Sequence, residues 1–347
     1  MKFRLKALRP IAAFGAVLAL AACSSTGTVA NSEPTAEALA EPTTVKVVVS
    51  SKIAYFVPYL MEEHWGEFAK QNIKLEVEFA PAPDALVLLA TGKIDAMVSG
   101  PSANVLNAVA QGSEVRMVAP GAIEPEDSVN GWYVSKAALD GKKFDVSMLE
   151  GQTLASSSGV AGPPLLTLSQ ALEEEGLTLA DVNISSMKQT DTVIALENGA
   201  VFGGTASQPN TTVILEADSG EMFARSAPLD YPSVSLMFGP TLLSDNTAVG
   251  EAFVLALLNT YKNHMQGDWL HDEKNIDLIA EVLETEKDLL LTVPSSLYPT
   301  TLAFPTDYIE SYEEVFRQMP DVLSYDEDTT VAARVTESSF MDFANGK

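Results

Sequence analysis

The 347-residue chain contains a single cysteine, Cys23. A lone thiol cannot form an intramolecular disulfide, so the folded part must be held together by its own hydrophobic core. Basic side chains are also scarce, because 21 lysines and arginines stand against 47 aspartates and glutamates. A surface with this excess of negative charge repels a phosphate backbone, and we therefore expect no nucleic-acid partner. After the first 22 residues no hydrophobic run reaches the length of a membrane span.

Several sequence motifs that are typical of enzymes are also missing. The chain has no Gly-x-Ser-x-Gly elbow, no Walker loop and no paired cysteines. His64, His264 and His271 lack the spacing of metal ligands, and we interpret all three as solvated residues on polar helix faces or in a turn. We therefore predict a binding protein rather than an enzyme, without a cofactor or a metal site.

The N-terminus has the pattern of an export signal. Four basic residues precede an apolar stretch at residues 11–22 that is too short to span a bilayer. Residues 20–23, Leu-Ala-Ala-Cys, resemble the lipobox of bacterial lipoproteins. That resemblance implies that residues 1–22 are a signal peptide, that Cys23 is diacylated, and that the protein is anchored in the cell envelope on the periplasmic or extracellular face.

Residues 23–44 are predicted to form a flexible linker behind the anchor. Ser, Thr, Ala, Glu and Pro dominate this segment, and too few large apolar side chains are present to offset the entropy of ordering it. Without the signal peptide, 17 basic residues remain against 47 acidic ones, a formal charge of −30. Such a surface repels anionic lipid, so we expect attachment through the acyl chains alone.

The remaining residues alternate between strand and helix patterns, which predicts an α/β fold. In a first series we expect strands at 45–49, 75–79, 94–98 and 115–119, with helices at 58–70, 84–91 and 102–111. In a second series we expect strands at 132–135, 153–156 and 182–187, with helices at 163–175 and 191–198. After a strand at 234–238, helical periodicity covers 247–265, 272–284 and 306–319.

An internal similarity links the two series. Residues 91–99 align with residues 198–206, each after a short helix and before a loop that contains proline. Gly92 and Gly199 are predicted to end a helix in the left-handed conformation, and the following apolar residues enter a buried strand. The loops after these strands then lie at the carboxyl edges of two sheets, where open α/β folds bind ligands.

Three stretches resemble the periplasmic-binding-protein family that includes nitrate, alkanesulfonate, taurine and thiamine-pyrimidine binders. These are residues 88–96, residues 149–155 leading to 172–177, and residues 181–187 followed by 191–199; the segment from residue 247 is also similar. The resemblance implies a two-lobed type II periplasmic-binding-protein fold with two interlobe crossings. On that pattern residues 45–127 plus 235–347 form lobe one, and residues 128–234 form lobe two. Phe202 departs from the family pattern. In relatives the second copy of the repeat commonly has an aspartate at this position, which corresponds to Asp95 in the first copy. We interpret Phe202 as a packing residue.

Loops that follow the strands supply the candidate ligand-binding residues. Hydroxyl groups and backbone amides at helix N-termini can hold an oxyanion without a basic side chain. The candidates are Ser50, Ser51, Tyr55, Ser99, Gly100, Ser102, Ser157, Ser158, Gly159, Ser207 and Gln208.

Ligand chemistry is left open by the sequence. A sulfonate or nitrate suits amide-rich loops, and Lys52 is a further source of positive charge. An aromatic ligand of the pyrimidine type suits Tyr55, Phe56 and Trp132 as stacking partners.

The resemblance implies a monomeric, membrane-anchored solute-binding subunit that delivers a small molecule to an ABC permease. Two alternatives stay open. One is an enzyme similar to the pyrimidine synthases of the same superfamily, although those depend on a cysteine-rich motif and this chain has no cysteine after Cys23. The other is a ligand-sensing lipoprotein that docks a receptor.

Replacing Cys23 by serine tests the anchor. Cys23→Ser removes the sulfur on which the thioether forms, so the protein should leave the membrane fraction. Detergent phase partition measures this, and unchanged retention of the variant in the detergent phase would contradict lipidation.

Overall fold

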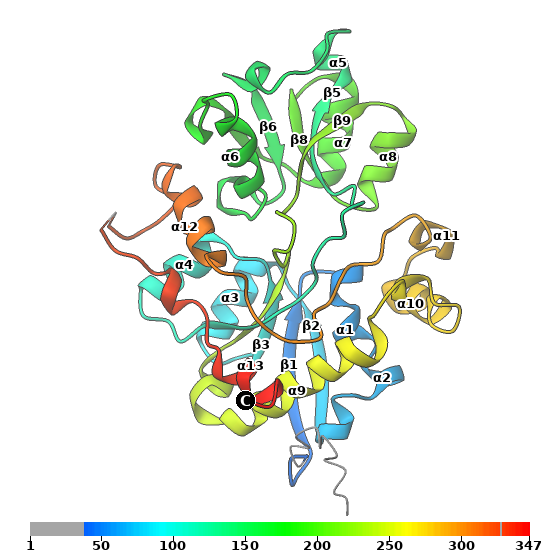
Figure 1. The fold of residues 1–347 in the computed structure, drawn as a ribbon, viewed down its shortest axis with the longest axis vertical. Coiled ribbons are helices and arrows are strands. Elements are labelled where there is room, and N and C mark those ends of the chain that lie inside the picture. Colours follow the sequence, from blue (N-terminus) through cyan, green and yellow to red (C-terminus); the bar gives the residue numbers. More distant parts are fainter. Residues whose placement is uncertain (1–37, 327) are drawn as a thin grey trace, which may run out of the picture. The chain divides into compact units, whose positions relative to one another are not determined.

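Two five-stranded β-sheets organise the fold (Figure 1). They are seen in a computed structural model that describes residues 38–326 and 328–347. The proposed signal peptide, Cys23 and most of the proposed linker lie outside the described residues.

The first sheet has the strand order β2-β1-β3-β10-β4. Its strands are β1 (Thr43–Val49), β2 (Ile73–Phe79), β3 (Ala96–Ser99), β4 (Arg116–Pro120) and β10 (Ser235–Phe238). β1 pairs in parallel with β2 and β3, whereas β10 runs antiparallel to β3 and β4. Helices α3 (Ala82–Ala90) and α4 (Ala103–Ala110) make the connections on either side of β3. Both faces of the central strands are covered, which explains the unbroken apolar run at Val47, Val48 and Val49.

The second sheet has the order β7-β6-β8-β5-β9. Its strands are β5 (Gly131–Ser135), β6 (Thr153–Ser156), β7 (Asn183–Ser186), β8 (Gly203–Ala206) and β9 (Gly220–Arg225). Its helices are α5 (Lys136–Leu139), α6 (Leu165–Glu173), α7 (Gln189–Asn198) and α8 (Asn210–Glu216). Here β5 is the antiparallel strand, between β8 and β9.

The two sheets therefore share one topology, and the predicted repeat is part of it. β3 and β8 are the central strands of their sheets, and each follows a helix that ends in a left-handed glycine. Gly92 has φ +67° and Gly199 has φ +71°, as predicted. Phe202 lies before β8 and packs against the hydrophobic core, which agrees with a packing role.

Two crossings connect the sheets. Residues 121–130 run from β4 to β5, and residues 226–234 run from β9 to β10. The crossings pair with each other, because Ser233 N donates to Ala122 O at 2.8 Å and Gly121 N donates to Val234 O at 2.9 Å. Each crossing thus begins at an edge strand of one sheet and continues into the antiparallel strand of the other.

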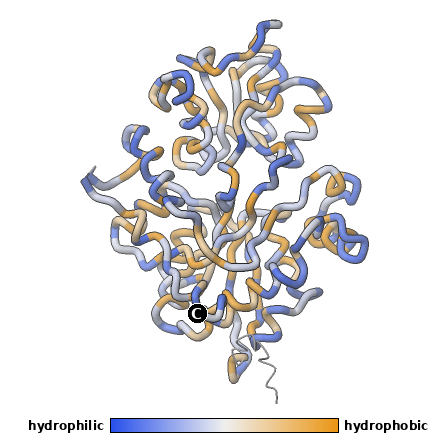
Figure 2. Tube along the Cα trace, in the orientation of Figure 1, coloured by the Kyte–Doolittle hydropathy of each residue, from blue (hydrophilic) through white to orange (hydrophobic). Residues whose placement is uncertain are grey.

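The C-terminal part of the chain is helical and packs mainly on the first sheet (Figure 1). It comprises α9 (Thr247–His264), α10 (Ile276–Leu283), α11 (Lys287–Leu290), α12 (Tyr308–Arg317) and α13 (Ser339–Ala344). Phe253 of α9 is fully buried, with its ring centre 4.7 Å from that of Phe68. Figure 2 shows hydrophobic residues along the strands and hydrophilic ones concentrated in the outer loops.

Two predictions about local structure were wrong, and two elements were not predicted. The helix expected at 58–70 is divided into α1 (Val57–Leu60), α2 (Glu62–Trp65) and the 3₁₀ turn η2 (Ala69–Gln71), after a preceding 3₁₀ turn η1 (Ala54–Phe56). Gly66 ends α2 because it takes a left-handed conformation at φ +68°. The linker ends earlier than residue 44, since Leu39 packs on the core, the Asn72 amide donates to Leu39 O, and β1 begins at Thr43. Strand β9 and helix α8 had not been predicted.

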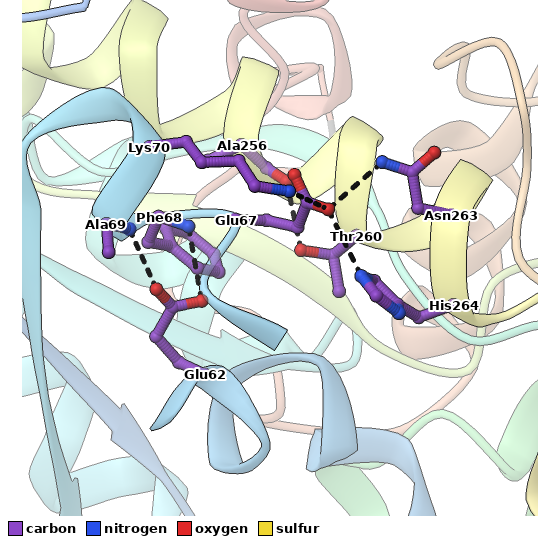
Figure 3. A network of polar contacts seen from close by, with 9 residues as sticks. All are labelled: Glu62, Glu67, Phe68, Ala69, Lys70, Ala256, Thr260, Asn263 and His264. Atoms are coloured by element: carbon purple, nitrogen blue, oxygen red, sulfur yellow. Dashed lines mark hydrogen bonds and ion pairs between the residues drawn. The ribbon is translucent and has the colours of Figure 1, made fainter. Parts of the chain in front are cut away.

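A buried glutamate in the turn between α2 and η2 connects this turn to the end of α9 (Figure 3). Glu67 is 2% exposed, and its Oε1 accepts hydrogen bonds from Lys70 Nζ at 2.7 Å, Asn263 Nδ2 at 3.0 Å and His264 Nε2 at 3.1 Å. The His264 ring also stacks on Trp65, with ring centres 4.7 Å apart and planes 4° from parallel. Because an ionised carboxylate can only accept, Nε2 of His264 must carry the proton.

The interpretation of all three histidines as solvated was therefore wrong for two of them. His64 is exposed, but His264 is packed as described, and His271 Nε2 lies 3.1 Å from Leu290 O. His264 packs on Trp65 and His271 contacts Leu290, and both contacts join segments that are separate in the sequence. Helical periodicity within one segment therefore could not predict them.

The Glu67 network generates a stability prediction. Burial by itself would raise the pKa of Glu67, but the hydrogen bonds from Lys70, Asn263 and His264 outweigh burial and lower it. A lowered pKa stabilises the folded state above the unfolded pKa, about 4.3, and that contribution is lost as the pH falls through the folded value. Glu67→Gln should therefore lower the free energy of unfolding at neutral pH by roughly 1–3 kcal/mol, with a smaller loss in acid.

Urea denaturation at a series of pH values measures this effect. Glu63→Gln, at an exposed position in α2 four residues before Glu67, is the matched control and should change little. Equal losses in the two variants, or a loss independent of pH, would contradict the assigned role of the carboxylate.

Candidate functional site

A cavity of about 380 Å³, called the hinge cavity below, lies beside the first crossing. Both sheets contribute loops to it. Its lining residues are Ser50, Ser51, Ile53, Ala54, Tyr55, Glu124, Pro125, Ser128, Val129, Asn130, Gln189, Ser207, Gln208, Pro209, Asn210, Val293, Pro294 and Ser296. This volume suits a small organic molecule.

The topology explains why these residues meet. Ser50 and Ser51 follow β1, and Tyr55 lies in the 3₁₀ turn η1 directly after them. Ser207 and Gln208 follow β8, the repeat partner of β3. The carboxyl ends of strands in the two sheets thus supply the two walls, as the position of ligand sites in open α/β sheets predicts.

Glu124 is the centre of a hydrogen-bond network in this cavity. Its side chain is 4% exposed and accepts from the hydroxyl group of Tyr55. Ser226 Oγ donates to its Oε1 at 2.6 Å, and Ser128 Oγ donates to its Oε2 at 2.8 Å. Asn130 Nδ2 donates to Oε1 at 3.2 Å. One carboxylate therefore ties the loop after β1 to both crossings.

The amide side chains extend this network into the second sheet. Asn130 Oδ1 accepts from Gln208 N at 2.8 Å. Gln189 Oε1 accepts from Ser207 N at 3.1 Å and from Asn210 Nδ2 at 3.2 Å. These bonds hold the loop after β8 against the first crossing and the start of α7.

Tyr55 acts as a hydrogen-bond donor across the physiological pH range. Burial raises its pKa well above the usual value of 10, and the neighbouring Glu124 carboxylate raises it further. The phenol therefore stays protonated and donates to Glu124.

The structure distributes the predicted site residues over two cavities. Ser50, Ser51, Tyr55, Ser207 and Gln208 line the hinge cavity. A second, serine-rich cavity of about 520 Å³ is lined by Ser50, Ser99, Gly100, Ser102, Ser157 and Ser158 together with neighbouring residues. Gly159 lines neither of them. Ser50 is common to both cavities, and all of these residues stay predicted ligand contacts.

Sequence reasoning missed the polar residues of the first crossing. Glu124 lies in a short acidic segment, residues 124–127, that matches no motif of a binding site, and Asn130 and Gln189 belong to no motif either. The available signal was position, since residues 124–130 immediately precede the strand that enters the second sheet.

Three predicted contributors to ligand binding lie elsewhere. Phe56 is 3% exposed and belongs to the same hydrophobic core as Phe253 of α9. Trp132 is fully buried and its Nε1 donates to Pro164 O at 2.8 Å, so neither ring is free to stack on a ligand in this structure. Lys52 pairs with Glu284 at 2.7 Å and does not line the hinge cavity.

Within residues 38–326 and 328–347, no group of three or more His, Cys, Asp or Glu side chains is arranged to hold a metal ion. None of the helices in the same described part of the chain is long and apolar enough to cross a membrane.

Two sheets of one topology, two paired crossings and a cavity lined from both sides define a two-lobed type II periplasmic-binding-protein fold. The chain belongs to the NMT1/THI5-like family, which matches residues 53–267, more than half of its length. A search of curated protein sequences returns no match.

Solved structures share the fold at low sequence identity. The alkanesulfonate-binding protein SsuA from Xanthomonas axonopodis pv. citri, bound to MOPS, is 16% identical with a TM-score of 0.61, covering 87% of this chain and 100% of that one. The aliphatic sulphonate binding protein SsuA from Escherichia coli is 16% identical with a TM-score of 0.57, covering 80% and 86%. The nitrate-binding protein NrtA from Synechocystis PCC 6803 is 10% identical with a TM-score of 0.59, covering 88% and 89%.

The Glu124 network predicts a specific loss in Tyr55→Phe. Removing the hydroxyl group leaves a buried carboxylate with one donor fewer, so the free energy of unfolding should fall by roughly 1–3 kcal/mol. Because the pKa of Tyr55 is raised, its contribution is lost only in strongly alkaline solution, and the difference should be constant from about pH 6 to about pH 9.

Urea denaturation of both proteins measures the loss. Tyr231→Phe is the matched control, since the one hydrogen bond of the Tyr231 hydroxyl group with a described residue is the 3.4 Å contact with Ser311. A loss in Tyr55→Phe no greater than in Tyr231→Phe would show that the network does not contribute to stability.

Proposed function

We propose that this protein is the solute-binding subunit of an ABC importer, anchored to the membrane by lipid at Cys23. It captures a small molecule in the hinge cavity and delivers it to a permease. The observation that carries this proposal is that one cavity is lined by loops from both sheets and by a crossing between them. A ligand bound there contacts both lobes at once.

Capture by closure follows from this geometry. Two short crossings are the covalent links between the two sheets, so small backbone rotations in residues 121–130 and 226–234 change the distance between the cavity walls. A ligand that contacts both walls stabilises the closed form, because its contacts are complete only there. This population shift provides the permease with a closed, ligand-bound conformation that it can recognise.

The family and the fold support a transport role. The solved relatives include binding proteins for sulfonates and for nitrate. On the sequence resemblance, the ligand belongs to the sulfonate, nitrate, taurine or thiamine-pyrimidine class. The lipid anchor would keep the mobile binding domain close to its permease and so raise the effective concentration for docking.

Thermal-shift screening of the mature domain tests the binding role. Nitrate, ethanesulfonate, taurine and an aminopyrimidine form the panel, and a probe that binds only the folded state should raise the melting temperature in a saturable way. Mass spectrometry of the recovered probe distinguishes binding from turnover.

Ser51→Trp places a large side chain in the hinge cavity and should abolish the shift. Ser244→Trp, at an exposed position outside both cavities, is the matched control and should preserve it. No shift with any probe, or chemical conversion of a probe, would contradict the proposed function.

A further inference from the structure

Three charged side chains are buried in the described part of the chain, and all are glutamates: Glu67, Glu124 and Glu313. Two of them have a cationic partner. Lys70 Nζ lies 2.7 Å from Glu67 Oε1, and Arg317 lies 2.8 Å from Glu313 Oε1. Pairing of this kind compensates the cost of removing a charge from water.

Glu124 is the exception among these three. Its donors, Tyr55, Ser128, Asn130 and Ser226, are all neutral, and no described lysine, arginine or histidine forms an ion pair with it. The guanidinium group of Arg225, at the end of β9, donates instead to Pro125 O at 2.7 Å and Glu126 O at 2.8 Å. The negative charge of Glu124 is therefore hydrogen-bonded but not neutralised by the described residues.

The lining of the hinge cavity does not compensate the negative charge of Glu124 either. Glu124 is the one carboxylic acid among its described lining residues, and none of these is a lysine, arginine or histidine. An anion in this cavity would meet an uncompensated carboxylate in a medium of low dielectric constant, where like charges repel strongly. An ammonium group would instead supply the positive charge that Glu124 lacks, and an N–H group would add a donor at Oε2, which accepts from Ser128 alone among the described residues.

We propose that Glu124 makes the hinge cavity selective for ligands that present an N–H donor and carry zero or positive net charge at that end, and that it rejects simple anions. This inference rests on the proposed function and narrows its ligand class. Among the classes that the sequence resemblance implies, it favours molecules with an amino group over nitrate and over sulfonates that have none.

The four hydrogen bonds from neutral donors to Glu124 also stabilise the two crossings. The test must therefore separate recognition of the ligand's charge from an effect on folding. Isothermal titration calorimetry compares three probes on the wild-type mature domain: ethanesulfonate, taurine and an aminopyrimidine. Ethanesulfonate and taurine share a sulfonate and a two-carbon chain and differ by one ammonium group, so they are matched in the anionic end and differ in net charge. We expect an amine-bearing probe to bind and ethanesulfonate to show no saturable binding.

Glu124→Gln keeps the shape of the side chain and an acceptor oxygen but removes the charge. Its affinity for the amine-bearing probe should fall by about tenfold or more. Glu124→Asp keeps the charge and should retain the preference for the amine. Glu67→Gln is the control for loss of a buried carboxylate outside the cavity, and it should leave affinity within about twofold of the wild type.

Binding of ethanesulfonate or nitrate in preference to the amine-bearing probes would overturn the inference while leaving the solute-binding function in place. An affinity of Glu124→Gln for the amine-bearing probe within about twofold of wild type would overturn it as well. If neither Glu124 variant folds, the preference of the wild-type protein between ethanesulfonate and taurine decides the question. Absence of binding by every probe counts against both the inference and the proposed function.

Discussion

The antiparallel pairing of the two crossings is the interaction on which the rest of this structure depends. Backbone hydrogen bonds join residues 121–122 to residues 233–234, and each crossing then continues into the antiparallel strand of the opposite sheet. Neither sheet is complete without a strand that arrives from the other one. The pairing therefore positions the loops after β1 and β8 on the two sides of a single cavity.

Glu124 adds a carboxylate group to the cavity that this backbone arrangement forms. Its carboxylate accepts from the loop after β1 and from both crossings, so the same group that stabilises the hinge also lines the cavity. A group with both roles couples ligand chemistry to lobe geometry, because whatever approaches the carboxylate also meets the segments that must rotate during closure. This coupling makes Glu124 more informative about function than the serines around it, which are ordinary turn and cap residues.

The fold could be predicted further than the site, and particular residues show why. The apolar run of β1 and the repeated glycine turns at Gly92 and Gly199 are local signals, so the α/β alternation and the repeat followed from sequence. Strand β9 was missed because it is a partly exposed edge strand without an apolar run. Glu124 was missed because its burial depends on Tyr55 and Ser226, which are 69 and 102 residues away in the chain.

The most direct test of the account is a crystal structure of the mature domain with the amine-bearing probe that binds most tightly. The probe should lie in the hinge cavity between Tyr55 and Gln208, with a nitrogen atom about 3 Å from a carboxylate oxygen of Glu124. A probe held in the serine-rich cavity, or one held in the hinge cavity through an oxyanion and without contact to Glu124, would contradict it.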